Sequence, residues 1–319
     1  MNKILSYIKR LKEISKKYNK SLIWLLFHML YWYIRIGATL TDYLNYQFYL
    51  KSSKDIKTYA VVGTQKKFYA IVSPEKYKKY FTIKPNFLNN FKKYVGREWY
   101  VPENGLNKLK SFIKNKEYIM IKPIDGLGGF GVKKIKVSDI KDINEFYNNL
   151  LNNRLFIEEL IIQNKDMNKL CDKSVNTIRV MTFVNNNEVE ILYAGVRIGN
   201  GKHAVDNFHS GGMGVAINLK NGRLMGNALD KDLNEYKVHP LSKTKFNNFQ
   251  IPCWENIISL VKEAALVNTN IKVVGWDVAI SENGPIFVEG NRRPGFDLVQ
   301  VSLRCGRKDI IDNVLKKVK

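Results

Sequence analysis

The stretch "IMIKPIDGLGGFGVKKIKV", residues 119–137, decides the fold class of this chain. Its glycines at Gly126, Gly128 and Gly131 satisfy the pattern G-x-G-x-x-G of dinucleotide-binding turns. A Rossmann turn needs a helix that begins on these glycines. The following "VKKIKV" instead alternates with a period of two, which predicts a strand. We therefore expect the glycines to join two antiparallel strands, and a Rossmann turn is excluded.

The surroundings of the glycines also exclude two other nucleotide-binding loops. A protein kinase has its lysine on a strand after the loop and needs H-R-D and D-F-G motifs, which do not occur here. The G-K-[ST] of a Walker loop is absent from the sequence as well. Lys122 lies on the strand that enters the loop, and glycine amides without a neighbouring Cβ approach phosphate oxygens closely. The stretch predicts a phosphate cradle, with a plain turn as the alternative.

A second stretch, "VGWDVAISENGPIFVEGNRRPG" at residues 274–295, predicts a hairpin that carries oxygen ligands. Asp277 lies on the first expected strand, and Glu289 and Asn291 end the second. Residues two apart on a strand face the same side, and the hairpin brings Asp277 beside them. Two carboxylates and an amide oxygen suit Mg²⁺ that also bridges nucleotide phosphates. We expect a metal site here, with a solvated hairpin edge as the alternative.

The rest of the sequence predicts an α+β fold. We expect helical pieces over residues 84–115, helices near 138–151 and 254–268, and a strand, a turn and a strand over "YAVVGTQKKFYAIV", residues 59–72. Further strands are expected over "RLFIEELI", "TIRVMTFV", "EVEILYAGVRIG" and "GVAINL". Strands in hairpins with helices grouped between them indicate α+β and not a regular parallel sheet.

The charge of the chain is strongly positive and unevenly distributed. The 319 residues include 52 Lys/Arg and 29 Asp/Glu, a net charge of +23. Residues 1–100 hold 20 Lys/Arg and 5 Asp/Glu, so +15 of this charge lies in the first third. Such a region favours an anionic partner: membrane headgroups, nucleic acid or a phosphorylated substrate. A generally Lys- and Asn-rich composition is the alternative explanation.

The N-terminal segment predicts two helices of different character. Residues 1–20 carry seven Lys/Arg and one Glu, and apolar residues recur there at helical spacing: Ile4, Ile8, Leu11 and Ile14. The apolar run Ser21 to Ile34 has 14 residues, whereas a spanning helix needs about 20. A buried helix is favoured for this run. The alternatives are a transmembrane span and an interfacial helix with its aromatic residues at headgroup level: Trp24, Tyr31, Trp32 and Tyr33.

The three cysteines, Cys171, Cys253 and Cys305, are far apart and form no C-x-x-C pair. They offer neither a disulfide framework nor a zinc site, which is typical of a reducing cytosol. We expect them to be buried as small hydrophobic residues.

Three of these segments together resemble the ATP-grasp enzymes. They are the lysine strand with its glycine loop "IKPIDGLGGFGV", the segment "LFIEELI", and the hairpin "WDVAI…IFVEGNRRPG", whose order and spacing are similar to that superfamily over residues 84–300. Looser motifs resemble its sugar-transfer-associated group, which is linked to bacterial exopolysaccharide and surface-glycan loci: "DYLNYQFY", "GREWYVP", "SVNTIRVMTF" and "GVRIGNGKHAVDNFHSGGMG". The resemblance implies an ATP-grasp fold, in which two α+β subdomains grip ATP, with an added helical N-terminal region. The implied segments are 1–58, 59–115, 116–165 with the glycine loop, and 166–319 with the Mg²⁺ site.

The resemblance also implies a set of nucleotide and metal contacts. The residues implied to bind ATP are Lys84, Lys122, Gly126, Gly128, Gly129, Glu158, Glu159, Ile161 and Gln163. Lys122 and the glycine amides would hold the phosphates, and the backbone of Glu159 and Ile161 would meet adenine. Glu158 would contact the adenine amino group. Asp166 competes with Gln163 as the ribose partner, and Lys78, Lys79 and Lys93 compete with Lys84 as the second phosphate lysine. Asp277, Glu289 and Asn291 would ligate Mg²⁺, for which Mn²⁺ can substitute.

The activity that the resemblance implies is an ADP-forming ligase that joins a carboxylate to an amine through an acyl phosphate. Arg179, Arg197 and Arg293 would then meet the developing negative charge, with a surface strand position as the alternative for each. The segment "DNFHSGG", residues 206–212, looks like a loop over the acceptor, in which Asn207 and Ser210 bind an oxyanion. His209 is a proton shuttle in this reading and a structural residue in the alternative.

The expected partners are a small-molecule carboxylate and an amine, such as an amino acid or a sugar derivative, and no specific nucleic acid. We expect a cytoplasmic protein, or one held at the inner face of the membrane through residues 1–35. Two other functions stay open at this point. One is an ATP-grasp kinase that phosphorylates a small acceptor, and the other is a non-catalytic protein that binds glycan or nucleic acid.

Overall fold

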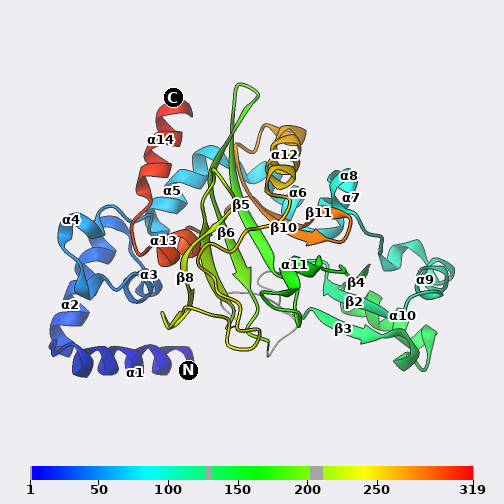
Figure 1. Cartoon of the computed structure of the whole chain (residues 1–319), viewed down its shortest axis with the longest axis horizontal. Helices are drawn as coiled ribbons and strands as arrows, with labels where there is room; N and C mark the ends of the chain where they lie inside the picture. The colour runs from blue at the N-terminus through cyan, green and yellow to red at the C-terminus, as the bar shows by residue number, and fades with distance from the viewer. Residues whose placement is uncertain (1, 127–130, 202–210, 319) are drawn as a thin grey trace. The chain divides into compact units, whose positions relative to one another are not determined.

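Residues 2–126, 131–201 and 211–318 are described by a computed structural model (Figure 1). The chain divides into two units. Unit 1 comprises Met1–Ile71 and Gly295–Lys319, and unit 2 comprises Val72–Pro294. This grouping differs from the four predicted segments, whose boundaries stay a prediction.

The regular secondary structure in the described residues of unit 1 is helical. Its helices are α1 (Asn2–Lys17), α2 (Leu22–Ile36), α3 (Leu40–Asn45), α4 (Ser53–Ile56), α5 (Val62–Val72, whose last residue belongs to unit 2), α13 (Asp297–Leu303) and α14 (Lys308–Val318). The two predicted N-terminal helices are therefore present. Aromatic rings fill the core, with Phe48 packed edge-on against Tyr59 at 5.3 Å between centroids. Gln300 of α13 ties the ends of the unit together, because its Oε1 accepts from the Ala60 amide at 2.8 Å.

The predicted strand pair over residues 59–72 is wrong, because Val62–Val72 forms helix α5. Phe68, Tyr69 and Val72 are buried, at a helical spacing that short apolar runs do not distinguish from a strand. Gly63 permits close packing at the start of the helix. Its amide donates to the Gly37 carbonyl at 3.0 Å, and a Cβ on Gly63 would lie 2.6 Å from the Gly37 Cα.

Two expectations about burial also need correction. The run Ser21 to Ile34 does form a helix, but of its side chains Leu25 and Trp32 are the buried ones, so the expectation of a buried helix is wrong. Among the cysteines, Cys171 is buried whereas Cys253 and Cys305 are exposed. In the described part of the chain, every helix is too short or too polar to cross a bilayer.

Unit 2 contains a four-stranded antiparallel sheet among its described residues. Its strands follow the order β1 (Trp99–Tyr100), β4 (Leu155–Glu159), β2 (Tyr118–Pro123) and β3 (Lys133–Lys136). Helices α9 (Leu106–Ile113) and α10 (Ile143–Asn152) lie beside it in Figure 1, and Leu109 and Leu150 bury against Ile119 and Ile157. The antiparallel pairing of β2 with β3 confirms that the glycine stretch joins two strands.

A larger antiparallel sheet, seven-stranded within the described residues, forms the rest of unit 2. Its order is β11 (Gly284–Asn291), β10 (Val273–Ser281), β5 (Thr177–Asn185), β6 (Glu188–Ile198), β7 (Met213–Ile217), β8 (Leu224–Asp230) and β9 (Glu235–Tyr236). The other α-helices within the described residues of this unit are α6 (Lys78–Thr82), α7 (Lys84–Asn90), α8 (Lys92–Val95), α11 (Lys165–Asn168) and α12 (Trp254–Ala265). The α+β fold and the β10–β11 hairpin are thus confirmed.

Strand alternation decides which side chains of β10 enter the core. Trp276 is buried, stacks on Phe287 at 4.8 Å and donates its indole N–H to the Thr182 hydroxyl at 2.9 Å. Because successive side chains on a strand point to opposite faces, Asp277 lies on the other side of the sheet. Its register partners are Glu289 on β11 and Arg179 on β5. Because Trp276 packs into the core, the Asp277 carboxylate lies on the opposite face of the sheet.

Candidate functional site

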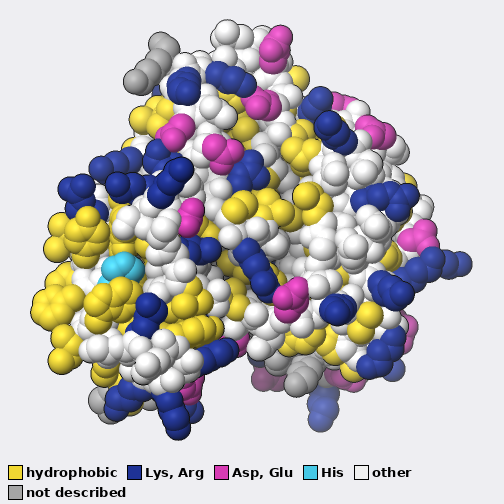
Figure 2. All heavy atoms as spheres, turned by 60° about the vertical axis from the view of Figure 1, so that its left-hand side comes forward, with side chains coloured by type: hydrophobic (Ala, Val, Ile, Leu, Met, Phe, Trp, Pro, Cys, Tyr) yellow, Lys and Arg dark blue, Asp and Glu magenta, His cyan; other side chains and the backbone are white. Residues whose placement is uncertain are grey.

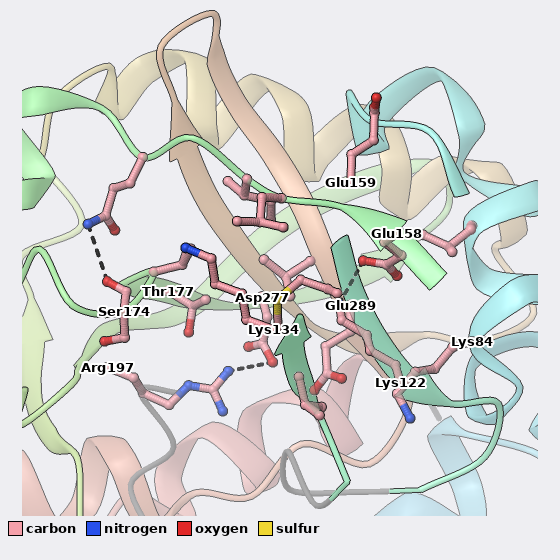
Figure 3. A pocket seen from close by; sticks show the side chains of 18 of the residues that line it. Lys84, Lys122, Lys134, Glu158, Glu159, Ser174, Thr177, Arg197, Asp277 and Glu289 are labelled. Atoms are coloured by element: carbon pink, nitrogen blue, oxygen red, sulfur yellow. Dashed lines mark hydrogen bonds and ion pairs between the residues drawn. The ribbon is translucent and has the colours of Figure 1, made fainter. Parts of the chain in front are cut away.

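Unit 2 has a cavity of about 410 Å³ that is lined by residues of both sheets. The four-stranded sheet contributes Lys122, Lys134 and Glu158, and the larger sheet contributes Arg197, Asp277, Glu289 and Asn291. In Figure 3, Lys84, Lys122 and Glu158 lie on one side of the cavity and Ser174, Thr177 and Arg197 on the other. The volume is that of a small-molecule site. The cavity therefore brings the predicted lysine strand and the predicted metal hairpin together.

Two lysines flank the start of the glycine loop. Lys122 on β2 and Lys84 at the start of α7 both line the cavity. The Lys84 Nζ donates to the carbonyl oxygens of Gly126, at 2.8 Å, and Pro123, at 3.2 Å. Burial lowers the pKa of Lys84, Glu289 partly offsets this, and Lys122 lowers it further. Two partly buried cations that line the same cavity favour an anionic ligand.

The three lysines that compete with Lys84 as the second phosphate lysine are absent from the described cavity lining. Lys78 pairs with Glu75, Lys93 pairs with Glu263, and Lys79 lines a separate surface hollow. Of the glycines, Gly126 lines the cavity and has a φ of 149°, a value that favours glycine. Gly128 and Gly129 lie outside the described residues.

A buried ion cluster connects strand β2, which carries Lys122, to strand β11. Glu158 on β4 is 2% exposed, and its Oε2 accepts from Lys122 Nζ at 2.7 Å and from Arg97 Nε at 2.9 Å. Arg97 also donates to the carbonyls of Phe287, at 2.6 Å, and Val288, at 3.3 Å, on β11. Since Glu289 follows Val288 directly, Arg97 holds Lys122 and the strand of Glu289 in one network.

The charge balance of this cluster predicts a stability that depends on pH. Burial would raise the pKa of Glu158, but Arg97 and Lys122 hold it at about 2, against an ordinary value of 4.5. A depressed pKa gives stability that is present above the unfolded value and lost as the pH falls toward the folded value. We expect Glu158 to contribute about 3 kcal/mol near neutral pH, and this contribution to disappear between about pH 4.5 and pH 2.

Chemical denaturation of the wild type and Glu158→Gln checks this. The deficit in unfolding free energy of the variant should be full at about pH 7 and clearly smaller at about pH 3. A deficit of equal size at both pH values would contradict the depressed pKa. Glu145→Gln, at an exposed position in the first turn of α10, serves as the control for replacing a glutamate.

A second buried cluster surrounds Asp277. Arg179 donates from Nε to Oδ1 at 2.5 Å and from Nη2 to Oδ2 at 3.0 Å, and Arg197 on β6 pairs with the same Oδ2. Burial would raise the pKa of Asp277, but the two arginines hold it well below its usual range. Arg197 and Asp277 line the cavity. Arg179 is absent from the described lining and contacts Asp277 from outside it. Figure 3 shows the Arg197 guanidinium pointing at the Asp277 carboxylate.

The oxygen donors of the hairpin are suited to a cation bound together with a ligand. Burial raises the pKa of Glu289, and the charge of the neighbouring Asp277 raises it further. The two buried carboxylates therefore repel each other. The Asn291 amide donates to Asp277 Oδ2 and to Glu289 Oε1, both at 3.3 Å, which keeps the three side chains in contact. Groups of three or more His, Cys, Asp or Glu that could hold a metal ion are absent from the described residues. Magnesium fits such a site, because it binds through one or two carboxylates together with ligand phosphates.

The segment predicted to contact adenine lines the cavity, through Glu159, Leu160 and Ile161. The Glu159 carboxylate accepts from the Glu98 amide at 2.7 Å. The side chain of Gln163 is engaged within the protein, with Oε1 accepting from the Asn176 amide at 2.6 Å and Nε2 donating to Asn168 at 2.8 Å. These contacts favour a structural role for its side-chain amide. Asp166 pairs with Lys169 and is absent from the described cavity lining.

Other predicted residues lie away from the described cavity or outside the description. Arg293 pairs with the exposed Glu75 at 3.0 Å and is absent from the described cavity lining. Asn207, His209 and Ser210 belong to residues 202–210, which lie outside the described residues.

Sequence reasoning missed two cationic residues: Arg97, which contacts Glu158 from outside the described cavity lining, and Lys134, which lines the cavity. Arg97 lies in the quoted "GREWYVP", but its partners are 61 and 190 residues away in the sequence. Lys134 is opposite Met120 in the β2–β3 register and lines the cavity. In the predicted strand "VKKIKV", Lys133 and Lys134 point to opposite faces, so this alternation places one of the two on the same face as the site.

The sequence matches the family described as sugar-transfer associated ATP-grasp over residues 88–316. This match spans well over half of the chain, so the protein belongs to the sugar-transfer associated ATP-grasp family. Comparison with curated proteins gives no match.

Several solved structures are similar to this chain. One is the ATP-grasp ligase PsnB in complex with precursor peptide PsnA2 and AMPPNP, at 14% identity and a TM-score of 0.47, covering 78% of this chain and 62% of that one. Another is the L-amino acid ligase from Bacillus licheniformis, at 15% identity and a TM-score of 0.46, covering 82% of this chain and 54% of that one. A third is D-alanyl-alanine synthetase A from Vibrio cholerae, at 11% identity and a TM-score of 0.46, covering 77% of this chain and 68% of that one. The chain spans about three fifths of the length of PsnB.

Proposed function

We propose that the protein is an ATP- and Mg²⁺-dependent ligase that joins a carboxylate to an amine, with ADP and phosphate as products. Membership of the sugar-transfer associated family supports a substrate that is a sugar or a precursor of a bacterial surface polysaccharide. The observation that carries the proposal is the single cavity in which Lys84 and Lys122 face the oxygen donors Asp277 and Glu289. Cations for phosphates and oxygens for a divalent ion are the two halves of a nucleotide-triphosphate site.

Each side of the cavity has a role in this proposal. Lys84 and Lys122 bind phosphate oxygens of ATP, and the amides of the glycine loop add hydrogen bonds. The backbone at Glu159 and Ile161 binds adenine. Glu158 orients Lys122 through their 2.7 Å contact, since its Oε2 already accepts from two cations.

Asp277, Glu289 and Asn291 would hold the metal ion. When bound, Mg²⁺ supplies positive charge that neutralises the phosphates. Arg197 and Arg179 fix the Asp277 carboxylate, and Arg197 presents a guanidinium to the cavity for the acceptor or the transferred phosphoryl group. Roles for Arg293, Asn207 and His209 stay predictions.

The proposed chemistry has two steps. A carboxylate oxygen of the substrate attacks the γ-phosphorus, the bond from that phosphorus to ADP breaks, and an acyl phosphate forms. The amine nitrogen then attacks the acyl carbon, the bond to phosphate breaks, and the nitrogen loses a proton. The negative charge that develops on the acyl oxygen is the part that arginine and lysine donors stabilise.

Trapping of the acyl phosphate tests this function. We expect the enzyme with ATP, Mg²⁺, a carboxylate panel and hydroxylamine to release ADP and form a hydroxamate with the preferred carboxylate. Lys122→Met should lower this rate by at least about 100-fold, because it removes a charge from the phosphate site. Lys110→Met, at an exposed position of α9, should leave the rate unchanged. AMP as the nucleotide product would overturn the proposal, and ADP with a phosphorylated acceptor would favour the kinase.

A further inference from the structure

Helix α2 of unit 1 turns an apolar stripe toward solvent. Ile23, Phe27, Leu30 and Ile34 follow one another at i, i+4, i+7 and i+11, which places them on one helix face. Their exposed fractions are 67%, 68%, 49% and 72%. The buried Leu25 and Trp32 lie on the opposite face. Side chains this apolar do not gain from facing water, so the stripe is built for a non-aqueous contact.

Residues on both sides of the stripe suit the interface between the hydrocarbon of a bilayer and water. The exposed flanking side chains are Trp24 and Tyr31 on one edge and Leu26 and Tyr33 on the other. Lys20 lies over the Trp24 ring at 4.5 Å. In Figure 2, a group of hydrophobic side chains lies at the surface with Lys and Arg side chains above and below it. Tyr and Trp with an apolar ring and a polar tip favour the headgroup level of a bilayer.

Helix α1 of the same unit adds positive charge. Lys9, Lys12 and Lys16 are exposed at i, i+3 and i+7, so they share one face of α1. Across residues 1–36 there are eight Lys/Arg and one Glu, which gives +8 − 1 = +7. Basic residues beside a helix of this kind attract the anionic headgroups of a membrane.

The observations favour a bilayer surface over the other occupants. The 15 residues of α2 measure about 22 Å, less than the hydrocarbon thickness of about 30 Å, so the helix lies on a bilayer and does not cross it. Interfaces between proteins are depleted in lysine, whereas this surface is flanked by it. We propose that α1 and α2 form a docking surface for anionic lipid bilayers. The α2 stripe enters the boundary between headgroups and acyl chains, and the α1 lysines lie over anionic headgroups. This inference does not depend on the ligase activity.

Vesicle co-sedimentation of the full chain tests the proposal. The wild type should sediment with vesicles of phosphatidylcholine plus phosphatidylglycerol far more than with phosphatidylcholine alone, and less as salt rises. Phe27→Ser/Ile34→Ser should reduce the bound fraction by about tenfold, because both side chains leave the apolar boundary. Lys12→Glu/Lys16→Glu should reduce binding to the anionic vesicles by about tenfold as well.

Matched variants elsewhere control for loss of apolar surface and of charge. Leu266→Ser/Val267→Ser removes two exposed apolar side chains of unit 2, and Lys108→Glu/Lys110→Glu reverses two exposed charges on α9. Both should bind vesicles like the wild type. All altered side chains are exposed, and thermal melts should coincide with that of the wild type.

Three outcomes would overturn the docking surface. The first is wild-type protein that stays in the supernatant with anionic vesicles. The second is a stripe variant that binds as well as the wild type. The third is a wild-type dimer in sedimentation velocity that Phe27→Ser/Ile34→Ser converts to a monomer without a change in vesicle binding. That result would assign the stripe to a contact between copies of the chain.

Discussion

Glu289→Gln is expected to lose at least about 100-fold in ATP turnover while its melting temperature stays level or rises. The loss follows because the carboxylate is a proposed ligand of the metal that neutralises the phosphates, a contribution of about 3 kcal/mol or more. A glutamine keeps the volume and an oxygen that accepts from the Asn291 amide. Steady-state ADP release, with saturating ATP and Mg²⁺, measures the loss.

The stability half of this prediction follows from the sign of the pKa shift. Burial and the adjacent Asp277 raise the pKa of Glu289, so its charged form is less favourable in the folded protein than in the unfolded chain. A raised pKa gives stability below the unfolded value that is lost as the pH rises through the folded value. At neutral pH the wild type therefore bears a cost that the neutral glutamine removes.

The turn of the same hairpin provides a matched control. Glu282 is exposed at the tip, so Glu282→Gln should retain both activity and stability. Full activity of Glu289→Gln would contradict a catalytic metal site at this hairpin. An inactive variant that also melts well below the wild type would show that Glu289 serves the fold.

Arg97→Met is expected to destabilise unit 2 by about 3–5 kcal/mol, the largest stability effect that we predict. Among the described residues, the substitution leaves Lys122 as the one cation that contacts the buried Glu158. It also removes the donors to the Phe287 and Val95 carbonyls. Breaking a buried pair from one side costs more than removing both charges. The melting temperature should fall by about 10 °C.

A double variant separates charge imbalance from lost packing. Arg97→Met/Glu158→Gln removes both charges, so it should recover part of the stability that Arg97→Met loses. Arg154→Met breaks the exposed pair with Asp125 and should change the unfolding free energy by less than about 1 kcal/mol. Equal effects of Arg97→Met and Arg154→Met would contradict a buried role for Arg97.

Local patterns of the sequence were sufficient to predict the two hairpins that build the site. Period-two alternation on both sides of Gly126 and Gly131 predicts the β2–β3 pair, and the turn between Asp277 and Glu289 predicts the β10–β11 pair. These patterns act over a few residues, and the register of a short hairpin follows from its turn.

Tertiary contacts explain what the sequence did not reveal. Arg97 receives its role from Glu158 and Phe287, which are remote in the chain. Helix α5 is predicted as strands because its apolar run, residues 68–72, is too short to distinguish a helix from a strand. The contact of Gly63 with Gly37 is not visible in a local pattern. The exposure of α2 depends on what covers it, and an apolar run alone does not say this.

The most direct measurement is a thermal-shift titration with a non-hydrolysable ATP analogue, with and without Mg²⁺, on the wild type, Glu289→Gln and Glu282→Gln. At one hundred times its dissociation constant, a ligand stabilises its native site by about 2.7 kcal/mol. We predict a Mg²⁺-dependent rise in melting temperature for the wild type and Glu282→Gln that is lost in Glu289→Gln. A wild-type melting temperature that does not respond to the analogue and Mg²⁺ would contradict a nucleotide site in this cavity.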